Sequence, residues 1–345
     1  MPLFIDLHID EKLTPETVRQ CHVADKAIQA KYGVQYLQVL LNQPQGYLFC
    51  LVEAPDKESC AKVHQEAHGN IACNILEITE SDFSALIGNR QKDSFDFIRN
   101  VDGSFDSGVR TILAVHTLGA GGNNRSVREM VRTEFARIGI RSTENAGNGL
   151  MFLFDSCTEA IDAGKTLLRK AKEYHTTELR LGIAMGMPLG KDGDFFEEAM
   201  KMAHIFSFVS ANGQITVSAQ TLMRYQGVAD DTIKVITPAD EKFITRALQC
   251  VERCVSDGGL EVDCFAKELG ISRSQLGRRL SGIINLSPND FIKEFRLRKS
   301  VSLMEEHDMN VTEVSMAVGF NNPSYFARCF QIRFGKTPSE YFYNT

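Results

Sequence analysis

The sequence predicts a multidomain α+β protein built from three modules of different construction. Residues 1–80 and 109–237 alternate strand and helix patterns, whereas residues 241–345 carry helical patterns only. Residues 81–108 are polar and rich in Ser, Asp and Gly, so they are expected to form a linker between the first two modules. A chain of 345 residues is long enough for two or three domains with buried cores.

The first module is expected to have the element order βαββαβ, which is the ferredoxin-like arrangement with both helices on one face of a sheet. Apolar residues at every second position of 3–9 predict the first strand. Thr14 and Pro15 then open a helix, with Thr as its cap and Pro at its first position. Strands are expected at 34–41, 46–54 and 71–79, and a second helix is expected to start at 54–56.

The second module repeats the alternation of strands and helices on a larger scale. Strands are expected at 111–119, 149–155, 179–186, 214–219 and 232–236, and helices at 124–139, 157–175 and 194–209. The pattern predicts a second α/β domain.

The third module carries two helix-turn-helix patterns. In the first, Gly270 takes a tight turn and Ser272 caps the helix that follows. In the second, Gly319 holds the turn and Asn322 precedes the helix start. A long helix over 288–306 is expected to connect the two units and to pack against both.

Each second helix leaves polar and basic side chains outside its apolar stripe. These outward residues are Ser272, Arg273, Ser274, Gln275, Arg278 and Arg279 on the first helix, and Asn322, Ser324, Tyr325, Arg328 and Arg333 on the second. Side chains of these types read the edges of bases in the major groove or bind phosphates. One such face alone is more often a solvated surface, but two in tandem favour binding of double-stranded DNA.

The second unit also resembles a known family in detail. The resemblance is carried by Gly319-Phe320, Ser324-Tyr325-Phe326, Arg328, Phe330, Phe334-Gly335 and Thr337-Pro338-Ser339-Glu340-Tyr341. These residues resemble the signature of the AraC/XylS family of bacterial transcription regulators, and the likeness extends over 242–345. It implies a seven-helix domain whose two recognition helices enter successive major-groove turns, about 10 base pairs apart.

Residues 110–235 resemble the catalytic domain of class III nucleotidyl cyclases. The carrying residues are the run 179–184 and the run 203–218. Because such cyclase domains pair head to tail, the resemblance implies a homodimer. A small-ligand or nucleotide sensor and a purely dimerising scaffold remain the two interpretations of this module.

The residues that an active cyclase requires are replaced in this sequence. Two aspartates normally hold the two catalytic metal ions, and the resemblance places His116 and Asn148 at their positions. Lys201 and Ile205 stand where an Asn and an Arg stabilise the transition state. Without the carboxylates the metal pair lacks hard anionic ligands, so we expect no enzymatic activity. The alternative is an active nucleotidyl cyclase fused to a DNA-binding domain.

The first module contains four of the eight histidines. His64 and His68 are spaced i, i+4 on the second helix and could chelate a metal, and His22 on the first helix could add a third nitrogen. His8 lies on the first strand opposite the apolar alternation, which predicts that it faces away from the helices. Plain surface histidines are the other interpretation.

The strings FIDLH at 4–8 and VHQEAHG at 63–69 make the first module resemble a small bacterial family of nickel-binding ferredoxin-like proteins. The resemblance covers 1–79 and implies a divalent transition metal, with nickel as its candidate. Imidazole ligands suit nickel, copper or zinc.

Composition excludes several classes of protein. The net charge of −6 gives no global basic field, and the nine cysteines are scattered without CxxC pairs, as in reduced thiols. The first ten residues lack the basic n-region and the long apolar core of a signal peptide, so none is expected, and no run reaches the roughly 18 apolar residues of a membrane span. We therefore expect a cytoplasmic transcription regulator without a membrane partner, controlled by a metal, a nucleotide or dimerisation.

Overall fold

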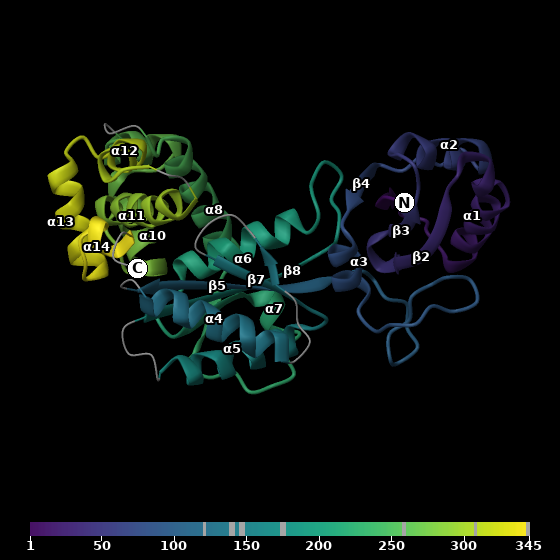
Figure 1. Cartoon of the computed structure of the whole chain (residues 1–345), viewed down its shortest axis with the longest axis horizontal. Helices are drawn as coiled ribbons and strands as arrows, with labels where there is room; N and C mark the ends of the chain where they lie inside the picture. The colour runs from purple at the N-terminus through teal and green to yellow at the C-terminus, as the bar shows by residue number, and fades with distance from the viewer. Residues whose placement is uncertain are drawn as a thin grey trace. The chain divides into compact units, whose positions relative to one another are not determined.

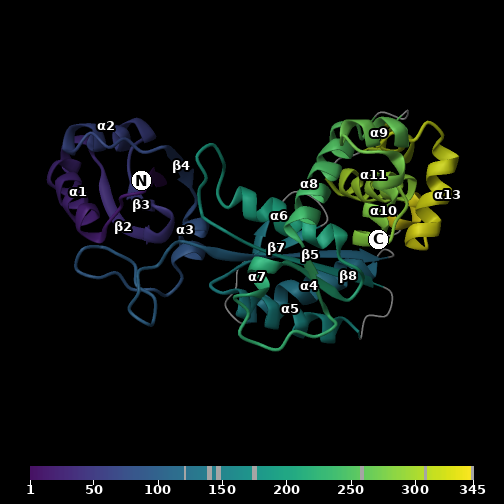
Figure 2. The ribbon, with the colours of Figure 1, turned by 180° about the vertical axis from the view of Figure 1, so that it is seen from behind.

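The computed structural model describes residues 1–119, 122–137, 142–144, 149–172, 177–256, 260–306 and 309–342 (Figures 1 and 2). The chain divides into two compact units. The first contains Met1–Arg110 and Met185–Ala199, and the second contains Thr111–Ala184 and Met200–Thr345.

The first unit is built on a four-stranded antiparallel sheet in the order β2-β3-β1-β4. Its elements are β1 (Leu3–Ile9), α1 (Pro15–Ile28), a 3-10 turn (Gln29–Tyr32), β2 (Gln35–Asn42), a second 3-10 turn (Gln43–Gln45), β3 (Tyr47–Glu53), α2 (Lys57–Ala67) and β4 (Asn74–Ile78). Thr14 caps α1 with a full capping box and Asp56 caps α2. The order βαββαβ is thus confirmed.

Both faces of this sheet are buried. Phe4, Val39 and Val52 join Val18 and Val63 in the core between the sheet and the helices α1 and α2. On the opposite face, Ile5 and Leu7 are also fully buried, and Gly108 lies against the ring of Phe49 there. The alternating residues of β1 therefore mark the face away from the helices. The other face of β1, with Asp6 and His8, points toward α1 and α2, so the expected orientation of His8 is wrong.

The segment after β4, expected as a linker, packs onto the first unit instead. It contains α3 (Glu80–Ile87) and three isolated bridges, one of which joins Phe97 to Val39 of β2. Phe97 is fully buried in the helix-side core. Arg110 is also buried, because its guanidinium donates to Asp106 at 2.7 Å and to the carbonyl of Leu86. A few apolar residues in a polar stretch are enough to anchor it.

The second unit begins with a six-stranded sheet in the order β10-β9-β8-β5-β7-β6. Its strands are β5 (Arg110–Gly119), β6 (Ser142–Glu144), β7 (Gly149–Phe154), β8 (Thr177–Gly186), β9 (Gln214–Ser218) and β10 (Ile233–Ile236). Its helices are α4 (Gly122–Arg137), α5 (Cys157–Ala171), α6 (Glu197–Val209) and α7 (Ala219–Leu222). Every strand and helix expected in this region is present, and β6 and α7 are additions.

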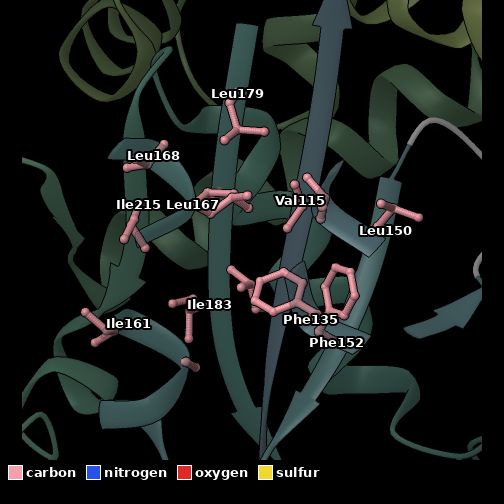
Figure 3. Packing of buried hydrophobic residues seen from close by; sticks show 14 of the residues in the cluster. Val115, Phe135, Leu150, Phe152, Ile161, Leu167, Leu168, Leu179, Ile183 and Ile215 are labelled. Carbon is pink, nitrogen blue, oxygen red and sulfur yellow. The ribbon is translucent and has the colours of Figure 1, made fainter. Parts of the chain in front are cut away.

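Helices cover both faces of this sheet. Figure 3 shows Phe135 of α4 and Leu167 of α5 in one core with Phe152 of β7, and the rings of Phe135 and Phe152 are 4.1 Å apart. On the opposite face, Gly182 of β8 lies so close to α6 that a Cβ there would stand 2.1 Å from the carbonyl oxygen of Ala203. A side chain at this position would push α6 off the sheet.

The rest of the second unit is helical. It comprises α8 (Pro238–Arg253), α9 (Val262–Glu268), α10 (Arg273–Ile284), α11 (Pro288–Glu306), α12 (Val311–Ala317), α13 (Pro323–Phe334) and α14 (Pro338–Phe342). Seven helices in the described part of this region are the number that the family resemblance implies. Helix α11 serves both helix-turn-helix units, because Phe291 stacks on Phe265 while Val301 packs with Phe326. Within the described residues, no helix combines the length and the apolar character that crossing a membrane requires.

Candidate functional site

The two helices that are expected to read DNA, α10 and α13, begin in the same way. Gly270 and Gly319 precede them with φ angles of +71° and +80°, a conformation that glycine adopts without steric cost. The Ser272 hydroxyl accepts the backbone N–H of Gln275 at 3.2 Å, and the Asn322 side chain accepts from two backbone N–H groups. Three of the predicted DNA-reading side chains, Ser272, Gln275 and Asn322, therefore take part in capping.

The two helices also match position by position when they are counted from their caps. Four and eight residues after the cap, α10 buries Leu276 and Leu280, and α13 buries Phe326 and Phe330. Six residues after the cap each helix carries an exposed arginine, which is Arg278 in α10 and Arg328 in α13. Neither arginine is paired with a carboxylate of the described residues. The remaining exposed predicted positions are Arg273, Ser274, Ser324 and Tyr325.

Two of the predicted DNA-reading arginines are held by other parts of the protein. Arg279 lies 4.0 Å from the ring centroid of Phe243 and donates to the carbonyl of Ala239 at 2.9 Å. Arg333 is bound by two carboxylates, with Nε 2.7 Å from Glu294 and Nη1 2.9 Å from Glu178.

The expected outward orientation of Arg333 is therefore wrong. Its position next to Phe334, at the edge of the apolar stripe, turns it toward the β-sheet of the same unit. The glutamates that hold it lie 39 and 155 residues away along the chain, and so helical spacing could not reveal them.

His116, which the cyclase resemblance places at the position of the first aspartate, is buried in the second unit. Its Nδ1 lies 3.1 Å from the Ser207 hydroxyl, and its ring meets that of His204 edge to face at 4.7 Å. Burial and the charge of Arg298 hold the pKa of His116 well below its ordinary value, so the imidazole is neutral. Asn148 lies outside the described residues.

The first unit brings three of the four predicted histidines together with two aspartates. His64 Nε2 is 2.9 Å from Asp6, and His8 Nε2 is 3.4 Å from the same carboxylate. On the other side, His64 Nδ1 is 3.3 Å from Asp25 and His68 Nε2 is 3.1 Å from it. Two trios result, Asp6–His8–His64 and Asp25–His64–His68, each with its ligand atoms within 4.8 Å of one another.

His64 belongs to both trios through different ring nitrogens. A neutral imidazole has only one nitrogen with a free lone pair, so His64 can complete one trio at a time. The hydroxyl of Tyr36 lies 3.2 Å from its Nε2 and the backbone N–H of Cys50 donates to Asp6 at 3.1 Å. These contacts orient the two groups that stand at the centre of the cluster.

The electrostatics of the cluster favour ion pairs in the metal-free protein. Burial opposes the charged form of His64, but the Asp6 and Asp25 carboxylates outweigh it and raise the pKa of His64 to about 10. Burial likewise opposes ionisation of Asp6, yet His64 and His8 lower its pKa. Binding of a metal would therefore release a proton from His64.

The cluster fits a transition metal on structural grounds. Among the described residues, the buried Nε2 of His8 and Oδ1 of Asp25 are within ion-pair distance of Asp6 and of His64 and His68, respectively, but neither atom has a contact with hydrogen-bond geometry. Unsatisfied buried polar atoms are uncommon, and a bound ion is one way to satisfy them. Imidazole nitrogens and carboxylate oxygens are ligands for nickel, copper and zinc.

His22 does not join this cluster, in contrast to the prediction. Its Nε2 lies 3.0 Å from Asp96, a residue of the segment that was expected to be a linker. Sequence reasoning missed Asp6 and Asp25 as candidate ligands. An aspartate between Ile5 and Leu7 in a buried strand was the available signal, because a buried carboxylate requires a partner.

Two families match the two ends of the chain. One described as "Helix-turn-helix domain" matches residues 265–344, and one described as "Nickel responsive protein SCO4226-like" matches residues 4–78. They confirm the two resemblances expected there, an AraC-type helix-turn-helix region and a nickel-responsive ferredoxin-like region.

Curated relatives match part of the chain. Histidine kinase P4 of Formosa agariphila is 38% identical over 106 residues, which are 31% of this chain and 8% of that protein. The uncharacterized HTH-type transcriptional regulator YdeC of Bacillus subtilis is 37% identical over 82 residues, which are 24% of this chain and 28% of that protein. The chain thus spans less than a third of the length of either relative.

Solved structures are also similar over parts of the chain. SCO4226 from Streptomyces coelicolor A3(2) is 31% identical, covering 22% of this chain and 94% of that one with a TM-score of 0.21. An adenylate/guanylate cyclase/hydrolase from Silicibacter pomeroyi is 24% identical, covering 33% of this chain and 78% of that one with a TM-score of 0.29.

Proposed function

We propose that the protein is a DNA-binding transcription regulator that reads double-stranded DNA through α10 and α13. The observation that carries the proposal is the matched pair Arg278 and Arg328. Both are exposed, both lack a carboxylate partner among the described residues, and both stand six residues after a cap. An arginine in this situation is available to bind a guanine edge or a phosphate. Such a role would place the protein with the chromosome in the bacterial cytoplasm.

The test is DNA affinity of single variants, measured by fluorescence anisotropy on a sequence selected from a random pool with the full chain. Arg278→Ala and Arg328→Ala should each weaken binding by about 1–3 kcal/mol if the arginine contacts a base. Lys242→Ala removes an exposed charge from α8, outside both recognition helices, and should bind as the wild type does. Wild-type affinity in both arginine variants would refute the assignment of α10 and α13.

We further propose that the first unit binds a divalent transition metal, with nickel as the first candidate. The two trios around His64 and the match of residues 4–78 support this. A bound ion supplies positive charge and directed coordination between β1, α1 and α2. Asp6 and Asp25 offer the oxygen ligands, and His8, His64 and His68 offer the nitrogens.

Calorimetric titration with nickel chloride tests the metal proposal. His64→Ala should lose binding, because His64 belongs to both trios. His22→Ala is the matched control, since it removes a buried histidine of the same unit that is paired with Asp96 instead. His8→Ala and His68→Ala distinguish the two trios, because each variant removes a ligand from one trio only. The variant that loses high affinity for nickel identifies the trio that binds it. Undiminished binding by His64→Ala would exclude the cluster.

Regulation would follow if metal binding and DNA binding favour the same state of the protein. A ligand shifts an equilibrium only by its differential affinity for the two states. Operator affinity should therefore differ between nickel-free and nickel-saturated protein. Identical affinities would show that the metal does not control DNA binding.

We also propose that the protein forms a homodimer, because the cyclase-like resemblance implies that two copies pair. The molar mass of the full chain in solution, measured by light scattering, tests this.

The middle domain is proposed to act without catalysis. A neutral, buried His116 at the first aspartate position supports this, because it offers no hard anionic ligand to a metal pair. Incubation with ATP or GTP and Mn²⁺ tests it. Formation of a cyclic nucleotide would establish the alternative, a cyclase fused to a DNA-binding domain.

A further inference from the structure

A cleft in the second unit lies where the six-stranded sheet meets the helix-turn-helix region. It measures about 660 Å³, within the usual range of small-ligand pockets. Its walls come from β8, the α6–β9 turn and β10 on one side, and from the ends of α10 and α13 and the middle of α11 on the other. No metal-binding trio of the described residues contributes to it.

The lining of this cleft has an excess of positive charge. Arg180, Lys234, Arg298 and Arg333 line it, and the carboxylates that pair with these cations are Glu178 and Glu294. Arg333 bridges both glutamates, Arg180 contacts Glu178 at 3.0 Å, and Arg298 contacts Glu294 at 2.8 Å. The four cations therefore exceed the two carboxylates by two positive charges.

Lys234 is the cation that has no carboxylate at all among the described residues. Its ammonium group donates to the carbonyl oxygens of Val209, at 3.1 Å, and of Ile283. Burial, and after it the charge of Arg180, lowers the pKa of Lys234. Because two carbonyls use two of the three N–H donors of an ammonium group, one donor remains for a ligand.

A half-buried lysine near Arg180, in a cleft that two further arginines line, is costly unless an anion offsets the charge. We propose that this cleft binds a small polyvalent anion, in contact with Lys234 and Arg180. Phosphate-bearing molecules and polycarboxylates share the required chemistry, which is several acceptor oxygens on a compact negative charge. The inference concerns a second ligand site and does not rest on the metal site of the first unit.

The position of the cleft gives such a ligand access to both DNA-reading helices. Ser281 to Ile284 are the last residues of α10, and Arg333 lies in the last turn of α13. An anion that attracts Arg333 would compete with Glu178 and Glu294 for its guanidinium. Ligand binding would then alter how α13 is held against the sheet, and with it the affinity for DNA.

Thermal unfolding of the full chain tests the site, with pyrophosphate, ATP and citrate as separate probes at constant ionic strength set with sodium chloride. At least one probe should raise the Tm by about 2 °C or more at saturation. A response to citrate alone identifies a polycarboxylate, and a response to pyrophosphate or ATP identifies a phosphate-bearing ligand. No rise with any probe would overturn the proposal.

Variants locate the response. Lys234→Met should lose at least tenfold in affinity for the active probe, and Arg180→Gln gives a second loss should Lys234→Met not fold. Lys165→Met removes a lysine of the same domain that is paired with Asp230, and should bind as the wild type does. Arg328→Ala should also retain binding, because it removes a charge from the DNA-reading face only. Unchanged affinity in Lys234→Met and Arg180→Gln, or a loss in Arg328→Ala, would place the anion elsewhere.

Discussion

The two helix-turn-helix units share one design and differ in how they are anchored. Both have a left-handed glycine, a polar cap, buried residues four and eight positions later and an exposed arginine at position six. A Cβ at Gly270 would meet nothing within 4 Å, whereas a Cβ at Gly319 would stand 2.4 Å from the carbonyl oxygen of Val255. Eleven residues after the cap, α10 has the apolar Ile283 and α13 has Arg333. The shared features form the motif. The differences show that the second unit makes additional contacts with neighbouring parts of the protein, through Gly319 and Arg333.

Substitution of the two turn glycines, Gly319 and Gly270, should give the largest difference in stability between the two units. Gly319→Ala should destabilise the domain by about 2–5 kcal/mol, because a left-handed alanine costs about 1–2 kcal/mol and the clash with Val255 adds overpacking. Gly270→Ala meets only the backbone cost, about 1–2 kcal/mol. Urea unfolding of both variants, followed by helical circular dichroism, measures the difference. Equal losses would mean that the close approach at Gly319 is absent in solution.

Arg333→Ala should be the next largest effect, at roughly 2–3 kcal/mol of stability, because it leaves two partly buried glutamates without their shared partner. Affinity for DNA should fall far less than in Arg328→Ala. The comparison variant is Arg279→Ala, whose more exposed side chain contacts one aromatic ring, one carbonyl and, at 3.5 Å, the carboxylate of Asp240. If Arg333→Ala loses as much DNA affinity as Arg328→Ala, Arg333 contacts DNA and the orientation described above is incorrect.

Low pH should weaken the ion pairs that Glu294 makes with Arg298 and Arg333. Burial raises the pKa of Glu294, but Arg298 and Arg333 outweigh it and lower the pKa to about 2 from an ordinary value of 4.5. Because the folded-state pKa is depressed, this stabilisation is complete above about pH 4.5 and is lost as the pH falls toward 2. Stability measured from pH 6 to pH 3 should therefore decline less steeply in Glu294→Gln than in the wild type. Parallel curves would show that Glu294 is not ion-paired in the folded state.

Removal of the helix caps should cause the smallest loss of stability, and the loss should be similar in the two units. Ser272→Ala and Asn322→Ala should each cost about 1 kcal/mol of stability, because each leaves backbone N–H groups of the first turn without an acceptor. Ser324→Ala, which removes an exposed hydroxyl of α13 that is not the cap, serves as the control. Calorimetry of the three variants checks the expectation, and a cap variant as stable as Ser324→Ala would contradict the capping role.

Local chemistry was well predicted from the sequence. Thr14 and Ser272 cap the helices that they were expected to cap, Asn322 stands before the helix that it was expected to precede, and the connecting helix begins at Pro288 as expected. Such features depend on residues within one turn of one another, so short stretches of sequence contain the necessary information.

Features that depend on distant residues were not predictable in this way. His22 pairs with Asp96, 74 residues away. His8 faces the helices because the alternating residues Ile5 and Leu7 of β1 are buried on the opposite face of the sheet. The anchoring of Phe97 in the core could not be read from a polar stretch. Three of the four proposed histidines did come together, but their aspartate partners emerged only from the packing of β1 against α1 and α2.

Helix α11 has a consequence for the promoters that the protein would recognise. Its 19 residues rise about 28 Å and its two ends pack into different helix-turn-helix units, so the distance between the two DNA-reading helices is set by a rigid rod. Each base pair inserted between the two contacted segments of an operator turns one of them by roughly 34° about the duplex axis, given about 10.5 base pairs per turn. Base substitutions in the operator should therefore change its affinity for the protein gradually, whereas a single base pair inserted or deleted between the two segments should abolish recognition. Among operators, the spacer between the two segments should vary in composition but not in length.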